Sequence, residues 1–91
     1  MIPKKGKVLV DFWAQWCGPC VTMMPVLEQY SETEGSVEVV KINVDENPDI
    51  SQEYNVRGIP TFIYFEDGEV VKRQTGMQTL EQLKELTKIK L

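Results

Sequence analysis

The chain has 91 residues, of which 42% are apolar and 26% are charged, with a net charge of −4 and no histidine. This length fits one small domain, so we expect residues 1–91 to form a single α/β domain, and the composition is ordinary for a globular protein. The basic residues are scattered, which argues against nucleic-acid binding. Without histidine, any chemistry falls to Cys, Asp, Glu, Lys or Tyr.

No apolar run approaches the roughly 20 residues of a membrane span, so we expect no membrane association. The N-terminus is basic, but the apolar segment after it is short, contains Asp11 and lacks the cleavage site of a signal peptide. We therefore expect a cytoplasmic protein, in which a disulfide is transient and catalytic. A mature chain whose signal peptide had been removed would show the same pattern.

The predicted elements alternate between strands and helices. Residues 8–13 are almost continuously β-branched and aromatic, which is typical of a strand covered on both faces. Apolar residues at three- and four-residue steps predict a helix over residues 18–33, with a kink at Pro25 because proline lacks an amide donor. A second strand follows over residues 37–44, and Pro48 begins a short helix.

The rest of the chain predicts a hairpin and a closing helix. Asp67-Gly68 is a strong turn signal between two apolar segments. Thr79 and Gln82 have the spacing of a capping box at the start of the last helix. In the resulting order β-α-β-α-β-β-α, the first two strands are expected to be parallel with a right-handed crossover, and the hairpin strands antiparallel.

Both cysteines, Cys17 and Cys20, lie between the first strand and the first helix, three positions apart. In a βαβ context this spacing is typical of a reversible dithiol. A thiolate at a helix N-terminus is stabilised by free N–H groups, so Cys17 is the predicted nucleophile and Cys20 the resolving thiol. Between them, Gly18 allows close backbone approach and Pro19 restricts the loop.

Three other interpretations of the cysteine pair stay open. A zinc site usually needs four ligands, and this chain offers two cysteines and no histidine, so we expect no metal. A permanent disulfide is expected mainly in secreted domains, and one that closes so small a loop constrains the unfolded chain little. Two unrelated buried cysteines can also fall at this spacing by chance.

Charged residues interrupt both apolar strands. Burial of Asp11 in the first strand would raise its pKa, and its place six residues before Cys17 suggests a proton shuttle for the resolving thiol, through water. Alternatively, Asp11 only caps the strand end. Lys41 in the second strand either pairs with Asp11 or extends its ammonium group to solvent.

These motifs, in order and spacing, resemble the thioredoxin family over essentially the whole chain. The matching segments are Val10–Ala14, Trp16–Cys20, Pro25, Asp45, Asn47-Pro48, Arg57–Thr61, Gly68 and Gly76. Gly18 and Pro19 between the cysteines are similar to those of true thioredoxins rather than of disulfide isomerases or glutaredoxins. The resemblance implies a minimal thioredoxin fold, with a four-stranded mixed sheet of order 2-1-3-4 flanked by three helices.

The resemblance also implies a role for each site residue. Cys17 would attack and Cys20 resolve, with Asp11 as the buried carboxylate, Lys41 as its partner and Pro60 as a cis-proline facing the disulfide. By base rate alone, the Ile59-Pro60 bond would be expected to be trans. Family substrate contacts would fall on Trp16, Gly18, Pro19, Ile59, Pro60, Thr61, Gly76 and Met77.

The implied activity is reduction of protein disulfides by a Cys17/Cys20 cycle, which maintains redox balance and donates electrons to target enzymes. We expect no cofactor, and a thioredoxin-reductase-type enzyme as the electron source. Two alternatives stay open. A disulfide oxidase or isomerase would have a higher redox potential, and a binding subunit of a larger assembly would act without turnover.

Two features depart from the family pattern. Val21 follows Cys20 where many thioredoxins carry a basic residue, which makes the surface there less positive and more apolar. The chain also begins almost directly at the strand that carries Asp11, without the strand and helix that precede it in most thioredoxins. We therefore expect a monomer with the second strand at an open sheet edge. We also expect either lower stability than a longer relative or protection of that edge by residues 1–6.

Overall fold

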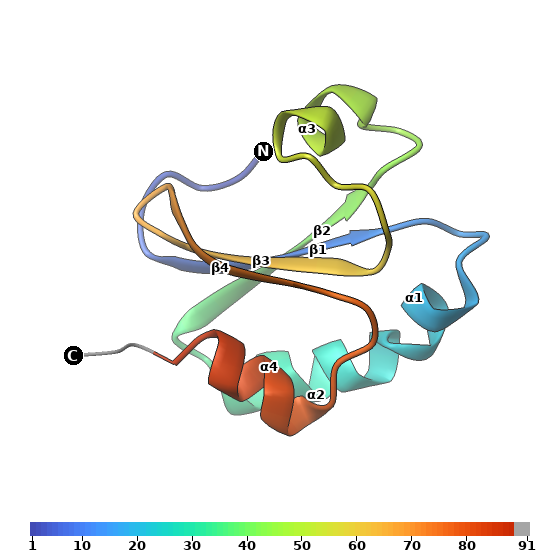
Figure 1. Cartoon of the computed structure of the whole chain (residues 1–91). Helices are drawn as coiled ribbons and strands as arrows, with labels where there is room; N and C mark the ends of the chain where they lie inside the picture. The colour runs from blue at the N-terminus through green and yellow to red at the C-terminus, as the bar shows by residue number, and fades with distance from the viewer. Residues whose placement is uncertain (89–91) are drawn as a thin grey trace.

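The computed structural model describes residues 1–88, in which four strands form one mixed sheet with helices on both faces (Figure 1). The sheet order is β2-β1-β3-β4, with β2 parallel to β1 and β3 antiparallel to both β1 and β4, as predicted. The elements are β1 (Lys7–Trp13), α1 (Gly18–Thr22), α2 (Met24–Thr33), β2 (Val37–Asn43), α3 (Pro48–Glu53), β3 (Thr61–Glu66), β4 (Glu69–Thr75) and α4 (Leu80–Leu86).

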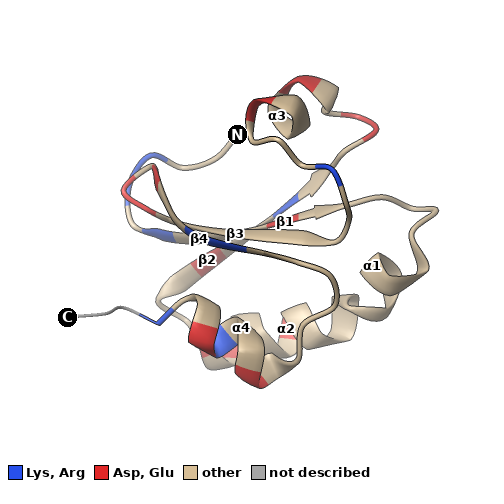
Figure 2. Cartoon of the chain, viewed as in Figure 1, with Lys and Arg blue, Asp and Glu red and all other residues tan. Residues whose placement is uncertain are grey.

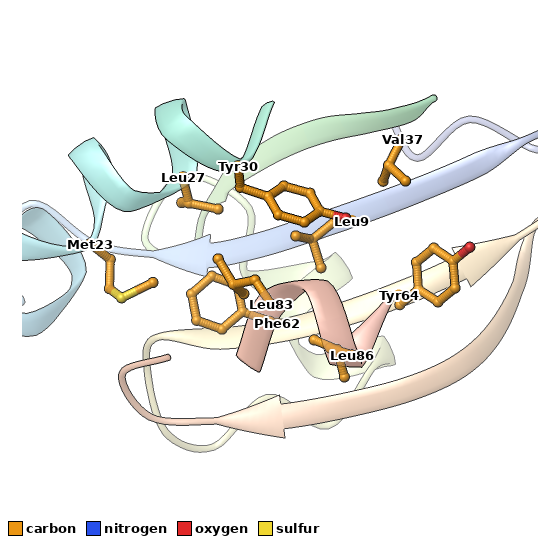
Figure 3. Close-up of a cluster of buried hydrophobic side chains, with 9 residues drawn as sticks. All are labelled: Leu9, Met23, Leu27, Tyr30, Val37, Phe62, Tyr64, Leu83 and Leu86. Carbon is orange, nitrogen blue, oxygen red and sulfur yellow. The ribbon is translucent and has the colours of Figure 1, made fainter. Parts of the chain in front are cut away.

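Strand β1 lies inside the sheet and is covered on both faces, which explains its nearly continuous apolar sequence. On one face, Leu9 belongs to a buried cluster with residues of α2, α4 and β3 (Figure 3). On the other face, Val8, Val10 and Phe12 pack together beneath α3. Asp11 is therefore on the α2/α4 face, because alternate residues of a strand share a face.

The predicted helix over residues 18–33 is interrupted at Met23, which separates α1 from α2. The Met23 amide donates to the carbonyl oxygens of Pro19 and Cys20, at 3.1 and 3.2 Å. Pro25 lies in the first turn of α2, where amide groups have no hydrogen-bond partner within the helix, so the missing donor costs nothing. The predicted single helix with a kink at Pro25 is therefore two helices, and the break between them precedes the proline.

The turn and capping signals are also confirmed. Asp67 and Gly68 both have positive φ, 52° and 85°, as a tight hairpin turn requires. At the start of α4, the Gln82 amide donates to Thr79 Oγ1 at 3.1 Å, and the Thr79 amide donates to Gln82 Oε1 at 2.9 Å. Of the helices formed by residues 1–88, none is long and apolar enough to cross a membrane.

The N-terminal segment does not lie along β2, so the expectation that it protects this edge is wrong. The Gly6 amide donates to Asp67 Oδ1 at 2.8 Å, and the Asp67 amide donates to the Gly6 carbonyl at 2.9 Å. Further back, Ile2 packs against the apolar cluster on the α3 face. The segment follows the β3–β4 turn because β1 begins beside the end of β3, on the opposite side from β2.

Candidate active site

Cys17 and Cys20 form a disulfide with their Cα atoms 5.2 Å apart. Cys17 is the N-cap of α1, and its Sγ accepts a hydrogen bond from the Cys20 amide at 3.2 Å. Cys17 is 5% exposed to solvent, whereas Cys20 is fully buried. The two sulfurs are therefore unequal, because only Cys17 reaches the surface and faces a helical N–H donor.

The loop before β3 lies beside Cys17. The Ile59-Pro60 bond is cis, and Cys17 Sγ is 3.8 Å from the Ile59 carbonyl oxygen. The Pro60 carbonyl accepts a hydrogen bond at 2.8 Å from the amide of Gly76, whose φ is +100°. The buried Thr61 side chain donates to the Gly58 carbonyl, which holds the loop in place.

The other predicted substrate contacts surround the disulfide to different degrees. Trp16 and Met77 are 71% and 53% exposed. Met77 follows Gly76, which is bonded to Pro60, so it lies close to the cis bond. Gly18 and Pro19 are exposed in the first turn of α1, Ile59 is half-buried, and Thr61 and Pro60 are buried.

Asp11 is fully buried, and neither of its carboxylate oxygens has a hydrogen-bond partner among residues 1–88. Desolvation by burial raises the pKa of Asp11 from 3.8 to about 7, and the charge of Lys41 opposes this rise in part. The carboxyl group can therefore exchange a proton near neutral pH.

The place of Asp11 along β1 brings it toward the cysteines. Leu9 and Trp13 are its neighbours on the same face of the strand. Leu9 packs in the cluster that includes Met23, and Trp13 packs against the cluster of Ala14 and the two cysteines. Along the strand, Asp11 thus stands between a residue of the core cluster and one that packs against the cysteines.

Lys41 is opposite Asp11 on β2 but does not close an ion pair with it. The two residues are register partners of the parallel strands. Asp11 has no partner for either oxygen within residues 1–88, and Lys41 is exposed. The lysine therefore acts on the carboxyl group only through its field.

Four hydrogen bonds at and near the site were not predicted from the sequence. The Trp16 indole donates from Nε1 to Asp45 Oδ2 at 2.8 Å, and Asn43 Oδ1 accepts from the Asp45 amide at 2.9 Å. Arg73 donates to the carbonyl oxygens of Tyr54 and Asn55, at 2.6 and 3.3 Å, where α3 ends before the Ile59 loop. For Asp45, the only signal was its place in the family pattern.

A thioredoxin family model matches residues 1–89. The thioredoxin of Rickettsia felis is 48% identical over 77 residues, which cover 84% of this chain and 73% of that protein. That of Staphylococcus aureus is 46% identical over 84 residues, covering 91% and 81%. Among the residues described, no group of three or more His, Cys, Asp or Glu side chains is placed to hold a metal ion.

Solved thioredoxin structures share the fold. The oxidized form of mitochondrial thioredoxin 3 from Saccharomyces cerevisiae matches with a TM-score of 0.85 and 36% identity, covering 91% of this chain and 78% of that one. A mutant thioredoxin from Halobacterium salinarum matches with a TM-score of 0.85 and 40% identity, covering 96% and 80%.

The fold and the disulfide at the N-terminus of α1 define a thiol-disulfide oxidoreductase. The chain belongs to the thioredoxin family. Its activity is the reduction of protein disulfides, and nothing in the comparisons favours the oxidase, isomerase or binding-subunit alternatives.

Proposed function

We propose that Cys17 is the attacking thiolate and Cys20 the resolving thiol of this reductase. Cys17 Sγ attacks one sulfur of a substrate disulfide, the substrate S–S bond breaks, and a mixed disulfide forms as the first substrate thiolate leaves. Cys20 Sγ then attacks Cys17 Sγ, and the second substrate thiolate leaves. The substrate gains two electrons and becomes a dithiol, while Cys17 and Cys20 become a disulfide. The observation that carries this assignment is the unequal exposure of the two sulfurs.

Asp11 serves in this proposal as the proton acceptor for Cys20. The Cys20 thiol must lose its proton before it attacks, and Cys20 is fully buried, away from bulk water. Asp11 is the buried carboxyl group on the same side of the sheet, and a pKa of about 7 matches proton transfer at neutral pH. Lys41 acts through Asp11, as a positioning charge rather than a catalytic group.

The substrate segment lies in this proposal along the backbone of Ile59 and Pro60, like an added strand. Trp16, Gly18, Pro19, Gly76 and Met77 surround the attacked disulfide, and Thr61 holds the loop from below. The support is the 3.8 Å approach of Cys17 Sγ to the Ile59 carbonyl oxygen, because a segment bonded to that backbone presents its sulfur to Cys17.

The partners follow from the cycle. Protein disulfides are the substrates, and a reductase of the thioredoxin-reductase type returns two electrons to the Cys17–Cys20 disulfide. This electron transfer would place the chain in cell redox homeostasis. A cytoplasmic location suits a disulfide that must be reduced again after each turnover.

We propose that residues 1–91 act as a single monomeric domain despite the open edge at β2. Glu38 and Lys41 point to opposite faces of β2, because Val39 packs on one face and Val40 on the other. Antiparallel pairing of two β2 edges about a two-fold axis keeps each face with itself, so it cannot place Glu38 against Lys41 of a second copy. Charges on an edge without opposite partners oppose self-association. A dimer in sedimentation equilibrium that pairs through β2 would contradict this.

Single substitutions of the cysteines test the central assignment. Cys17→Ser is expected to abolish reduction of a protein disulfide by the pre-reduced chain. Cys20→Ser is expected to accumulate a mixed disulfide between Cys17 and the substrate, visible by mass spectrometry. If Cys17→Ser instead trapped the substrate on Cys20, the two roles would be reversed.

A further inference from the structure

The segment of the chain that carries Cys17 is uncharged, and several apolar side chains around it are exposed. No Asp, Glu, Lys or Arg occurs from residue 12 to residue 27, and α1 with the loop before it shows no charged residue in Figure 2. We call Trp16, Val21, Ile59 and Met77 the active-site rim. Trp16, Val21 and Met77 are 71%, 50% and 53% exposed.

Val21 belongs to this rim because of its place in α1. Its amide donates to the Cys17 carbonyl at 3.1 Å, which is the first helical bond of α1. Residues four apart lie on the same side of a helix, so Val21 is on the side of Cys17, whereas Cys20 faces the core. Its methyl groups are therefore available to a substrate that reaches Cys17.

One charged side chain, that of the exposed Asp45, contacts the rim at Trp16. Asp45 accepts the Trp16 indole N–H at 2.8 Å, and Arg57 donates to the Asn55 side chain at 3.1 Å. The other charges are spread over the remaining helices and strands (Figure 2). Beyond about 10 Å, charges are largely screened at 0.1 M salt. Around Val21 the rim thus offers a substrate apolar contacts, whereas beside Trp16 it carries the negative charge of Asp45.

We propose that Val21 is a specificity-determining residue, through which the rim selects disulfides flanked by apolar, uncharged segments. This inference rests on the proposed function, because it takes Cys17 as the attacking thiol. Transfer of apolar surface from water drives the contact, and a charged flank facing Val21 loses hydration without gaining a partner.

Three peptides test this selection. They share one disulfide loop and differ only in the residues beside it, which are leucine and valine, glutamate, or lysine. Their reduction is followed with the pre-reduced chain, without a reductase. The wild-type chain is expected to reduce the leucine-valine peptide fastest, at a rate that changes little between about 20 mM and about 300 mM salt. The lysine and glutamate peptides are expected to react more slowly, at rates that converge at high salt as the charge of Asp45 is screened.

The substitution Val21→Lys tests the role of Val21 in specificity, and Val70→Lys is the control. Val70 is 48% exposed, nearly as much as Val21, and lies beside the β3–β4 turn at the other end of β4 from Gly76. We expect V21K to reduce the glutamate peptide about threefold faster at low salt, from Coulomb attraction across about 7 Å of water, and to lose this gain at high salt. V70K is expected to leave all three rates unchanged.

Val21→Thr keeps the branched shape and removes one methyl group. We expect an about fivefold loss for the leucine-valine peptide alone. An equal loss for all three peptides would overturn the proposal, because it would place the effect in the dithiol itself, and so would equal effects of V21K and V70K. If the wild-type chain reduces all three peptides at equal rates, the proposed selection of apolar flanks is refuted, but the assignment of Cys17 as the attacking thiol is not. If it reduces none of them, the proposed function is refuted as well.

Discussion

Two stretches of the same face of the sheet differ in how their buried polar groups are bonded. In the cluster of Figure 3, the Tyr30 hydroxyl bonds to Thr87 Oγ1, and the Tyr64 hydroxyl donates to Glu66 Oε2 at 2.8 Å. Two residues beyond Leu9 of this cluster, Asp11 has no partner for either oxygen within residues 1–88.

Buried polar groups are normally hydrogen-bonded, so the bonded tyrosines are what packing alone requires. Burial raises the pKa of both tyrosines above the usual range, which keeps their hydroxyl protons in place. A buried carboxyl group without partners lowers stability once it ionises, so its presence two residues before Trp13, which packs against the cysteines, points to function. The two tyrosine hydroxyl groups thus stabilise the fold, whereas the Asp11 carboxyl group serves the chemistry.

The largest expected effect is that of Asp11→Asn on stability. Because burial raises the folded-state pKa of Asp11 to about 7, the wild-type chain is most stable below pH 3.8 as far as this group is concerned, and loses that stability as pH rises through 7. At pH 8.5 the variant should be more stable by on the order of 4 kcal/mol.

Urea unfolding of the oxidised wild type and D11N at several pH values measures this difference. The two curves should coincide below about pH 4, diverge steadily between pH 4 and 7, and run parallel above pH 7. A difference in unfolding free energy that stays constant over the whole pH range would show that folding does not change the pKa of Asp11. D11N should also slow disulfide reduction near neutral pH, where the carboxylate accepts the proton.

A smaller effect on stability is expected for Tyr30→Phe, in the stretch whose buried hydroxyl groups are hydrogen-bonded. The variant removes one buried hydroxyl, while Thr87 Oγ1 keeps its bond to the Leu83 carbonyl at 3.1 Å, so unfolding should become easier by about 1 kcal/mol. Reduction rates should not change. If Y30F folded normally but reduced disulfides more slowly, Tyr30 would not be a purely structural residue, and the distinction from Asp11 would fail. Thr87→Val serves as the second arm of a double-mutant cycle.

The smallest effect is expected for Lys41→Met. The lysine charge lowers the pKa of Asp11, so its removal should move the midpoint of the pH–rate profile of reduction to higher pH. The exposure of Lys41 weakens its field, so the shift should be small. Glu38→Gln, on the same strand but the opposite face, is the control. A shift to lower pH in K41M would contradict this electrostatic role.

The sequence predicts those parts of the fold and site that depend on neighbouring residues. The Asp67-Gly68 turn and the capping box at Thr79 follow from residues at most three positions apart, and both are present. Asp11 is conspicuous because a carboxylate rarely interrupts an apolar strand. The sheet order and the cis bond before Pro60 depended on the family resemblance.

Contacts between distant residues were beyond such reasoning. Trp16 and Asp45 are 29 positions apart, and Arg73 lies 19 positions from Tyr54, so no local pattern pairs them. The course of residues 1–6 was mispredicted for the same reason, because it depends on where β1 begins relative to the β3–β4 turn. Side chains on two elements meet only after the sheet has set their separation.

The most direct test of the proton-transfer role is an NMR titration of the Asp11 carboxyl carbon in the oxidised chain. We expect a midpoint near pH 7, set by burial and moderated by Lys41. A midpoint near 4, the ordinary range of an aspartate, would show a solvated or bonded carboxyl group and would remove Asp11 as the proton acceptor for Cys20.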